Sequence, residues 1–290
     1  MDGAAAGRRG AASAPDFPFA DAAAFAAAPL AAQREALTGL SPARREAWLR
    51  ILENDPRAGR RALARSLRHQ AERQGARERR WRELAGFDRR LAAGRLLAGV
   101  DEAGRGPLAG PVTAGAVILP PGYHAPGLDD SKRLTPAARA RWAERLRAEA
   151  LAWAVADVEA SDIDHLGIRE AVHRAMARAL ADLGREPDLI LFDGREVPYG
   201  MAGARAVVGG DRRSLSVAAA SVLAKVHRDS LLADYDALWP DYGFARHKGY
   251  GSAEHCDALL RLGPCPIHRR SFCGRWLPAA PRPSGTGAAR

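Results

Sequence analysis

The sequence predicts an α/β protein: a mixed β-sheet flanked by helices, with a basic helical extension on its N-terminal side. From residue 96 onward, short apolar runs alternate with helical segments, a pattern typical of helices packed on a sheet. Before residue 93, Arg-rich segments instead carry apolar residues at every third or fourth position. A length of 290 residues accommodates one large domain or two modest ones.

Changes in composition divide the chain into four segments. Residues 1–34 are Ala-rich with scattered Gly and Pro, and we expect a disordered leader there. Residues 35–92 form the basic helical extension, residues 93–277 form the α/β domain, and residues 278–290 are a Pro- and Gly-rich tail that we also expect to be disordered.

The extension begins with clear helix signals. Ser41 is a candidate N-cap and Pro42 a candidate first helical residue, Asp55-Pro56 repeats the signal, and Gly75 is expected to interrupt the second helix. Apolar residues at helical spacing are Trp48, Ile51, Leu52, Leu63, Leu67, Trp81, Leu84, Phe87 and Leu91. The exposed side is strongly basic, and it either holds a phosphate backbone or is a solvated face beside a packing surface. The sequence leaves both interpretations open.

Pro and Gly separate the elements of the α/β domain in order. Pro120-Pro121-Gly122 ends the second strand, Thr135-Pro136 opens the first helix, and Gly184 ends the next one. We expect strands at 96–101, 112–119, 153–158, 188–192 and 204–208, and helices at 136–150, 168–183, 215–238 and 253–262.

Charge, cysteine spacing and the apolar runs together favour a nucleic-acid partner and argue against a disulfide-rich secreted protein or a membrane protein. The formal net charge of +10 and pI near 10.3 favour an anionic partner such as nucleic acid, although an arginine-rich background composition has the same effect. Cys256, Cys265 and Cys273 lack the spacing of a zinc site or a disulfide framework, which favours a reducing compartment. Without a secretory signal or a membrane-length apolar run, we expect a cytoplasmic protein.

Four carboxylates stand where an α/β sheet places its sites. Asp101 and Glu102 end the first strand, Asp193 ends the apolar run 189–192 expected in the middle of the sheet, and Asp211 precedes the long helix. A carboxylate directly after an apolar strand is costly to desolvate unless it is paired or binds a cation. Together these oxygens predict a seat for two Mg²⁺ or Mn²⁺ ions.

Such an ion pair, ~3.5–4 Å apart, clamps the attacking and leaving oxygens of a phosphodiester and makes a protein nucleophile unnecessary. The sequence shows no Ser-His-Asp or Cys-His arrangement that would supply one. One geometric difficulty remains, because consecutive strand residues point to opposite faces. We therefore expect the strand to end or bulge near Gly104 and Gly106, which would rotate Glu102 toward Asp101.

The glycine-rich segment 101–112, DEAGRGPLAGPV, resembles the signature of bacterial ribonuclease HII. Further matches follow in order and at the family's spacing, over about residues 95–276. They are DSKRL at 130–134, DG at 193–194, GD at 210–211, SVAAASVLAKVHRD at 216–229, YGF at 242–244, HKGYG at 247–251, PIHR at 266–269 and SF at 271–272.

This resemblance implies a ribonuclease H-like fold for the catalytic domain, cleavage of RNA in RNA/DNA hybrids, and incision 5′ to a single ribonucleotide in duplex DNA, leaving 3′-hydroxyl and 5′-phosphate ends. It implies that Asp101, Glu102, Asp193 and Asp211 are catalytic and that the first three hold metal. It also implies substrate recognition by Gly104, Arg105 and Gly106, which would read the 2′-hydroxyl, and by Tyr250, which would stack on the next sugar. Lys132 is a candidate phosphate contact, with a surface lysine as the alternative. A monomer is expected.

Smaller assignments accompany these. Lys225 either pairs within its helix or contacts substrate, His247 and Lys248 are expected to face nucleic acid, and His268 is expected to order the C-terminal loop. Two other functions remain as alternatives at this point: a basic nucleic-acid-binding module without catalysis, and a metal-dependent nuclease acting on a DNA junction. The turn at 104–106 argues against the second alternative, since DNA has no 2′-hydroxyl to read.

Overall fold

A computed structural model describes residues 19, 22–198, 200–201 and 203–276. The chain divides into two compact units, Met1–Ala76 and Arg77–Arg290, which we call the N-terminal and C-terminal units. The division falls inside helix α4 (Ala58–Ala92), whereas composition placed the change at residue 92. The last turns of α4 pack with the C-terminal unit, because Leu84 is fully buried in its core.

The N-terminal unit is helical, with α1 (Ala22–Ala27), α2 (Leu30–Thr38), α3 (Pro42–Glu53) and the first part of α4. Its buried apolar residues are Phe25, Leu37, Leu49, Leu52, Leu63, Ala64 and Leu67. The expectation of disorder is therefore wrong for residues 22–34, because helix formation there buries Phe25 completely. The predictions of disorder at 1–18, 20–21 and 278–290 concern residues outside the described ones.

Two details of the helical extension differ from expectation. Helix α4 continues through Gly75, because a single glycine costs a helix only about 1 kcal/mol and good helix formers surround it. In α3, Pro42 does occupy the first turn, but Leu49 and Leu52 form the buried face while Ile51 is 41% exposed.

The C-terminal unit is built on a five-stranded sheet of order β3-β2-β1-β4-β5. Its strands are β1 (Leu97–Ala103), β2 (Val112–Ile118), β3 (Ala152–Val158), β4 (Leu189–Asp193) and β5 (Ala204–Val207). The β1–β2 and β2–β3 pairs are antiparallel, and the β1–β4 and β4–β5 pairs are parallel. The mixed sheet is confirmed; its central strand is β1, and β4 lies between β1 and β5.

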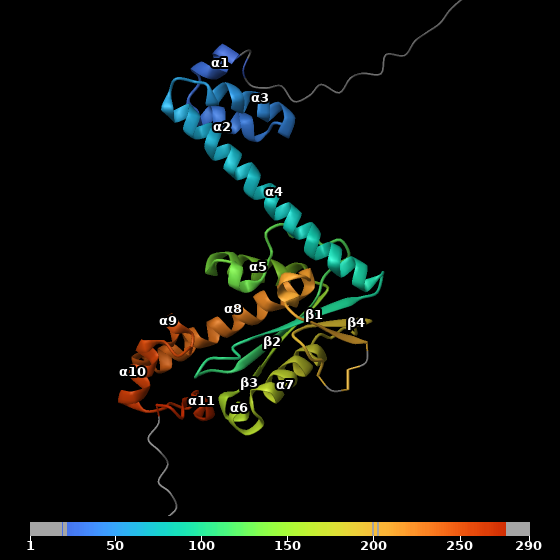
Figure 1. Ribbon diagram of the computed structural model, residues 1–290, viewed down its shortest axis with the longest axis vertical. Helices are drawn as coiled ribbons and strands as arrows, with labels where there is room; N and C mark the ends of the chain where they lie inside the picture. The colour runs from blue at the N-terminus through green and yellow to red at the C-terminus, as the bar shows by residue number, and fades with distance from the viewer. Residues whose placement is uncertain (1–18, 20–21, 199, 202, 277–290) are drawn as a thin grey trace, which may run out of the picture. The chain divides into compact units, whose positions relative to one another are not determined.

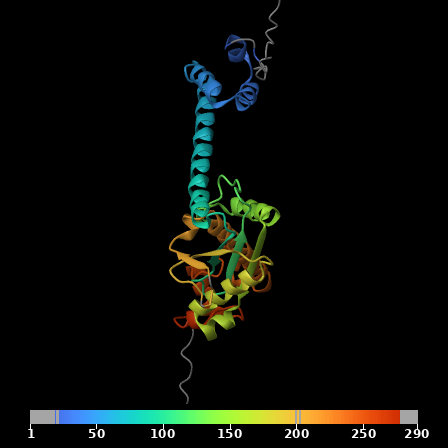
Figure 2. The same ribbon diagram turned by 90° about the vertical axis from the view of Figure 1, so that its right-hand side faces the viewer.

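Helices cover both faces of this sheet (Figures 1 and 2). Residues of α7 (Ile168–Ala181) pack in one core cluster with β1, β2 and β3, and α8 (Leu215–Leu238) packs on the opposite face. The remaining helices are α5 (Pro136–Glu149), α6 (Ala160–Leu166), α9 (Phe244–His247), α10 (Ala253–Leu262) and α11 (Arg270–Cys273). Short 3₁₀ turns are η1 (Ser131–Arg133), η2 (Gly210–Arg212) and η3 (Pro240–Tyr242).

Two glycines let α8 lie directly on the backbone of the sheet. A Cβ on Gly99 of β1 would stand 2.2 Å from the carbonyl carbon of Ser216, and one on Gly115 of β2 would stand 2.6 Å from the carbonyl oxygen of Ala220. The contacting stretch of α8 is accordingly small and buried, with Ala218, Ala219, Ala220 and Ala224 all at 0% exposure. This close approach brings the start of α8 next to the end of β1.

We therefore expect Gly99→Ala to destabilise the C-terminal unit by about 1–3 kcal/mol, because the added methyl group would overlap the backbone of α8. Chemical denaturation followed by circular dichroism measures the change. Gly274→Ala is the matched control, since a Cβ there meets nothing within 4 Å. Equal stability of the Gly99→Ala variant and the unmodified protein would contradict the close-packing argument.

Candidate active site

Three aspartates from separate segments converge at one edge of the sheet. One carboxylate oxygen from each of Asp101, Asp193 and Asp211 lies within 4.8 Å of the others. Asp101 comes from β1, Asp193 from the end of β4, and Asp211 from η2, just before α8. Asp101 and Asp211 are each only 4% exposed. Side chains distant in sequence thus form one oxygen-rich cluster.

Strand register explains this convergence. Gly99 faces α8, so Asp101, two residues later, faces the same side. On β4, Leu191 packs with Val217 of α8, which places Asp193 on that side as well. The backbone N–H of Gly210 donates to Asp193 Oδ1 at 2.6 Å, and this bond fixes the turn that carries Asp211.

Glu102 lies apart from the cluster. Of the two alternatives expected near Gly104, the strand ends there and does not bulge. β1 pairs regularly with β2 through Glu102↔Ala114 and Ala103↔Thr113 and stops at Ala103, so Glu102 is not rotated toward Asp101. Glu102 therefore points to the face opposite Asp101. Its Oε1 lies 3.5 Å from Nη1 of Arg105, the exposed side chain of the next turn.

The site concentrates negative charge that the protein itself only partly neutralises. Burial, together with Glu102 and Asp193, raises the pKa of Asp101 well above its ordinary value. Burial raises the pKa of Asp211, as do Asp130 and Asp193. Burial also raises the pKa of Glu102, with Arg105 opposing and Asp193 adding to the effect. Such a set of hard oxygen donors fits a divalent cation of the Mg²⁺ or Mn²⁺ type.

The nearest cations to the cluster are exposed side chains. Lys132 Nζ lies 3.5 Å from Asp211 Oδ2, and its side chain is 80% exposed. Arg212 Nε lies 3.8 Å from Asp211 Oδ1, with its side chain 65% exposed. Because solvent screens both, neither replaces a bound metal ion as the neutralising charge.

Two fully buried arginines hold the glycine-rich loop that follows β1. Arg228 of α8 donates to the carbonyls of Pro111, Lys248 and Ala109 at 2.9–3.0 Å. Arg269 donates to the carbonyls of Gly110, Arg105, Gly104 and Pro111 at 2.6–3.1 Å. Burial and the neighbouring Arg228 lower the pKa of Arg269 only to about 9, so it stays charged near neutral pH.

The glycine-rich loop has no room for a side chain at Gly104, where it contacts Arg228. Gly104 has φ +87°, and a Cβ there would stand 2.0 Å from Arg228 Nε. Sequence reasoning did not single out Arg228 or Arg269. The spacing Ala220, Ala224, Arg228 was the available signal, because four-residue steps keep Arg228 on the sheet-facing side of α8.

Tyr250 stands beside this loop, 46% exposed, with Lys225 Nζ 6.0 Å from its ring centroid. Lys225 also pairs with Asp229 one turn along α8, at 2.7 Å, as one of its two expected roles required. A chain of hydrogen bonds fixes the Tyr250 backbone: His255 Nδ1 lies 2.9 Å from the Tyr250 carbonyl, and His255 Nε2 lies 3.0 Å from His268 Nε2.

Three smaller expectations can be compared with these contacts. His268 does order the C-terminal loop, since the N–H of Cys265 donates to its Nδ1 at 3.0 Å. His247 and Lys248 were expected to face nucleic acid. His247 Nε2 lies 2.7 Å from the Tyr242 carbonyl, and Lys248 Nζ donates to the Asp229 carbonyl at 3.1 Å; these internal contacts do not test that expectation, which stays a prediction.

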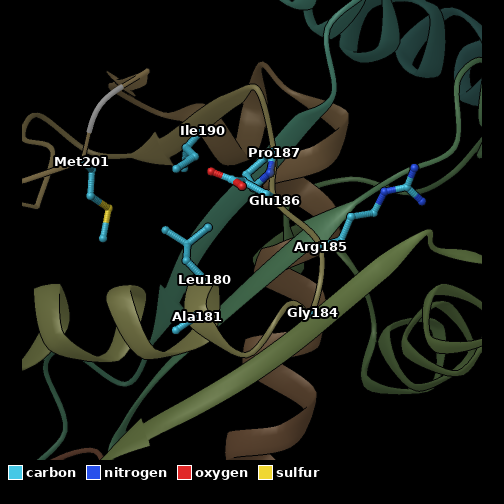
Figure 3. A pocket seen from close by; sticks show the side chains of 8 residues that line it. All are labelled: Leu180, Ala181, Gly184, Arg185, Glu186, Pro187, Ile190 and Met201. Carbon is cyan, nitrogen blue, oxygen red and sulfur yellow. The ribbon is translucent and has the colours of Figure 1, made fainter.

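An apolar pocket of about 370 Å³ lies elsewhere, at the opposite end of β4 from Asp193 (Figure 3). Ile190, Leu180 and Met201 are among its lining side chains, and the carboxylate cluster is not. This pocket is therefore separate from the charged site.

Among the described residues, no helix has the length and apolar character needed to cross a membrane.

Comparison with known proteins agrees with this geometry. The family profile described as Ribonuclease HII matches residues 98–275. A ribonuclease HII from Anaeromyxobacter sp. (strain Fw109-5) is 48% identical over 223 residues, which cover 76% of this chain and 71% of that protein. One from Moorella thermoacetica is 54% identical over 176 residues, covering 61% and 85% respectively.

The fold is also shared with a solved structure. The crystal structure of ribonuclease H2 from Pyrococcus horikoshii OT3 matches with a TM-score of 0.53 and 27% identity, over 62% of this chain and 98% of that one. With the profile covering more than half of the chain, the conclusion is direct: this protein belongs to the ribonuclease HII family and is a metal-dependent endoribonuclease that acts on RNA/DNA hybrids.

Proposed function

We propose that this enzyme also incises duplex DNA 5′ to single embedded ribonucleotides, and that both reactions proceed by two-metal-ion hydrolysis leaving 3′-hydroxyl and 5′-phosphate ends. The observation that carries the proposal is the three-aspartate cluster beside a glycine loop with an immobilised backbone. Family membership decides against the two alternatives, a binding module without catalysis and a nuclease for DNA junctions.

Asp101, Glu102 and Asp193 are proposed as metal ligands, and Asp211 as the fourth catalytic carboxylate. Bound divalent ions supply a lowered pKa for the attacking water and neutralise charge on the leaving 3′ oxygen. Asp101 and Asp193 present oxygens from adjacent parallel strands, and Gly210 N–H keeps Asp193 Oδ1 in place. Glu102, on the other face of β1, would complete the site from its rim.

Substrate recognition is proposed for Gly104, Arg105 and Gly106, which would read the 2′-hydroxyl largely through backbone groups. The carbonyls of Gly104 and Arg105 accept from Arg269, so this backbone is already ordered before substrate arrives. Preorganised polar groups discriminate better than mobile ones. Lys132, with its exposed ammonium next to Asp211, is proposed to contact a phosphate.

Tyr250 is proposed to stack on the sugar beyond the ribonucleotide and so to require a deoxyribose there. Support comes from its exposed ring and its anchored backbone. The proposal further includes Mg²⁺ or Mn²⁺ as the ions, the cytoplasm as the compartment, and one copy of the chain as the working form.

Asp193→Asn is expected to lower turnover at least ~100-fold while duplex binding stays near normal or tightens, because the lost charge acts mainly in the transition state. Single-turnover cleavage and filter binding on a duplex with one ribonucleotide measure the two effects. Asp182→Asn, an exposed aspartate at the end of α7, is the control. Normal turnover in Asp193→Asn would remove this residue from the metal site.

Tyr250→Ala is expected to reduce kcat/KM on a duplex with one ribonucleotide by up to about 5- to 150-fold, the range for losing one base–aromatic stack, and to affect a long hybrid much less. Tyr250→Phe, which keeps the ring, should behave like the unmodified enzyme on both substrates. Matched losses on the two substrates in Tyr250→Ala would refute the role in reading the junction.

Metal binding should stabilise the fold more as pH rises. Because the pKa values of Asp101, Glu102 and Asp211 are raised, the folded state without metal binds protons more tightly than the unfolded chain. The contribution of these groups to the free energy of unfolding therefore decreases as pH increases. Mg²⁺ competes with those protons. The increase in Tm on adding Mg²⁺ should therefore be larger at about pH 8 than at about pH 5.5.

The quantity compared is the difference between the Tm with Mg²⁺ and the Tm without Mg²⁺ at each pH. Burial lowers the pKa of His268 to about 4 from 6.5, so that group makes the baseline stability fall as pH decreases through this window. Asp211→Asn should reduce the Mg²⁺ effect. A Tm increase independent of pH and of Asp211 would show that the ion stabilises the protein elsewhere.

A further inference from the structure

The C-terminal half of α4 contacts the two turns that carry Asp211 and Lys132. Its inward residues recur at helical spacing on one face, which we call the brace. The brace consists of Arg80, Trp81, Leu84, Phe87 and Asp88. All of them belong to the C-terminal unit, and all precede residue 98, where the match to the family profile begins.

Arg80 bridges the two turns. Its Nη2 donates to the carbonyl of Arg212, the residue after Asp211, at 2.7 Å. The same guanidinium donates to Asp129 Oδ1 from Nη2 at 3.1 Å and from Nε at 3.3 Å. Asp129 leads directly into the turn at Ser131–Arg133, which carries Lys132. One planar fork therefore sets the spacing between the two segments.

Asp88 fixes the start of α8. Its Oδ2 accepts from the backbone N–H of Ser216 at 2.8 Å and from the Ser216 hydroxyl at 2.9 Å. Ser216 is also the residue whose backbone lies against Gly99 of β1. Asp88 thus holds the first turn of α8 where that helix meets the strand of Asp101.

The other brace residues dock the helix. Leu84 is fully buried, Trp81 Nε1 donates to the Tyr123 carbonyl at 2.9 Å, and the Phe87 ring lies 5.1 Å from the guanidinium of Arg213. The two charged members do something different, because their bonds reach the backbone or the flanking carboxylate of segments that bear site residues.

We propose that the brace positions Asp211 and Lys132 for the reaction, with Arg80 as the principal positioning residue. The proposal rests on the roles assigned above to Asp211 and Lys132. Helix α4, which precedes the residues 98–275 matched by the family profile, would then set the position of the Asp211 carboxylate. The match with the Anaeromyxobacter protein is longer than residues 98–275 can contain, so part of this preceding region is common to that relative.

Arg80→Ala and Arg80→Lys test the proposal, with Arg79→Ala, an exposed arginine of the same helix, as the matched control. Lysine keeps the charge but cannot bridge two acceptors with a rigid fork. Both Arg80 variants should lose kcat about 10- to 100-fold, the cost of small misplacement of a catalytic group, with KM for the ribonucleotide duplex little changed. Arg79→Ala should retain full kcat.

Salt dependence separates positioning from direct phosphate contact. If Arg80 acts only by positioning Asp211 and Lys132, the slope of log KM against log salt concentration stays as in the unmodified enzyme. If Arg80 instead contacts a phosphate, its loss should reduce that slope by about 1. A raised KM with a shallower slope, full activity in Arg80→Lys, or an equal loss in Arg79→Ala would each overturn the proposal.

Metal affinity gives a second readout that does not depend on activity. Calorimetric titration of Mn²⁺ into Arg80→Ala should show weaker binding than in Arg79→Ala, because a displaced Asp211 would no longer add its negative charge beside the oxygens of Asp101 and Asp193. If Arg80→Ala does not fold, Asp88→Ala replaces it, with Asp88→Asn as its partner; the amide oxygen of Asn still accepts from Ser216 N–H and should restore kcat. Equal kcat in the two Asp88 variants would contradict the proposal.

A double variant distinguishes failure of the brace from failure of the proposed site. Arg80→Ala should cost little further activity when combined with Asp211→Asn, since both act on one carboxylate. If Asp211→Asn alone is fully active, the role of Asp211 is wrong. If Asp211→Asn is inactive but Arg80→Ala is not impaired, only the brace is wrong.

Discussion

The close approach of α8 to the backbone of β1 and β2 is the contact on which the site depends. It needs glycine at positions 99 and 115, where any Cβ would overlap the helix backbone. It also needs small residues along the facing side of α8. With the helix this close, the turn before α8 delivers Asp211 to the strand ends that carry Asp101 and Asp193. A bulkier interface would separate these carboxylates, and the cluster would no longer suit a divalent cation.

The candidate site of the C-terminal unit has two halves, the carboxylate cluster and the glycine-rich loop, and their charges are balanced in different ways. The carboxylate half gathers like charges whose pKa values are raised by burial, which leaves it in need of an external cation. The loop half is organised by the buried cations Arg228 and Arg269, which find carbonyl oxygens rather than carboxylates as partners. Both halves meet at the end of β1, so Asp101, Glu102 and the backbone proposed to read the sugar come from one continuous segment.

Much of this fold was predictable because its local signals are strong. The helix at Leu215–Leu238 and the helix at Ala253–Leu262 have the expected bounds, and each of the five strands lies within two residues of its prediction. Local signals were misleading where tertiary packing competes with them. Gly75 did not break α4, and Phe25 draws an Ala-rich segment into a helical core. The strand does end near Gly104, but the expected rotation of Glu102 toward Asp101 was wrong, because the ladder to β2 keeps its register through Ala103.

The order of the elements, the family and the identity of the acidic residues could all be predicted from the chain alone, because apolar periodicity and contiguous motifs are local properties. Tertiary structure alone decided which carboxylates meet: Asp101, Asp193 and Asp211 share a face, while Glu102 stands on the other. It alone revealed that Arg228 and Arg269 hold the glycine loop and that Arg80 and Asp88 reach the turns beside the site. These contacts join residues far apart in the chain, and their partners are mostly backbone groups. Every residue has such groups, so no spacing in the sequence marks the ones that will be used.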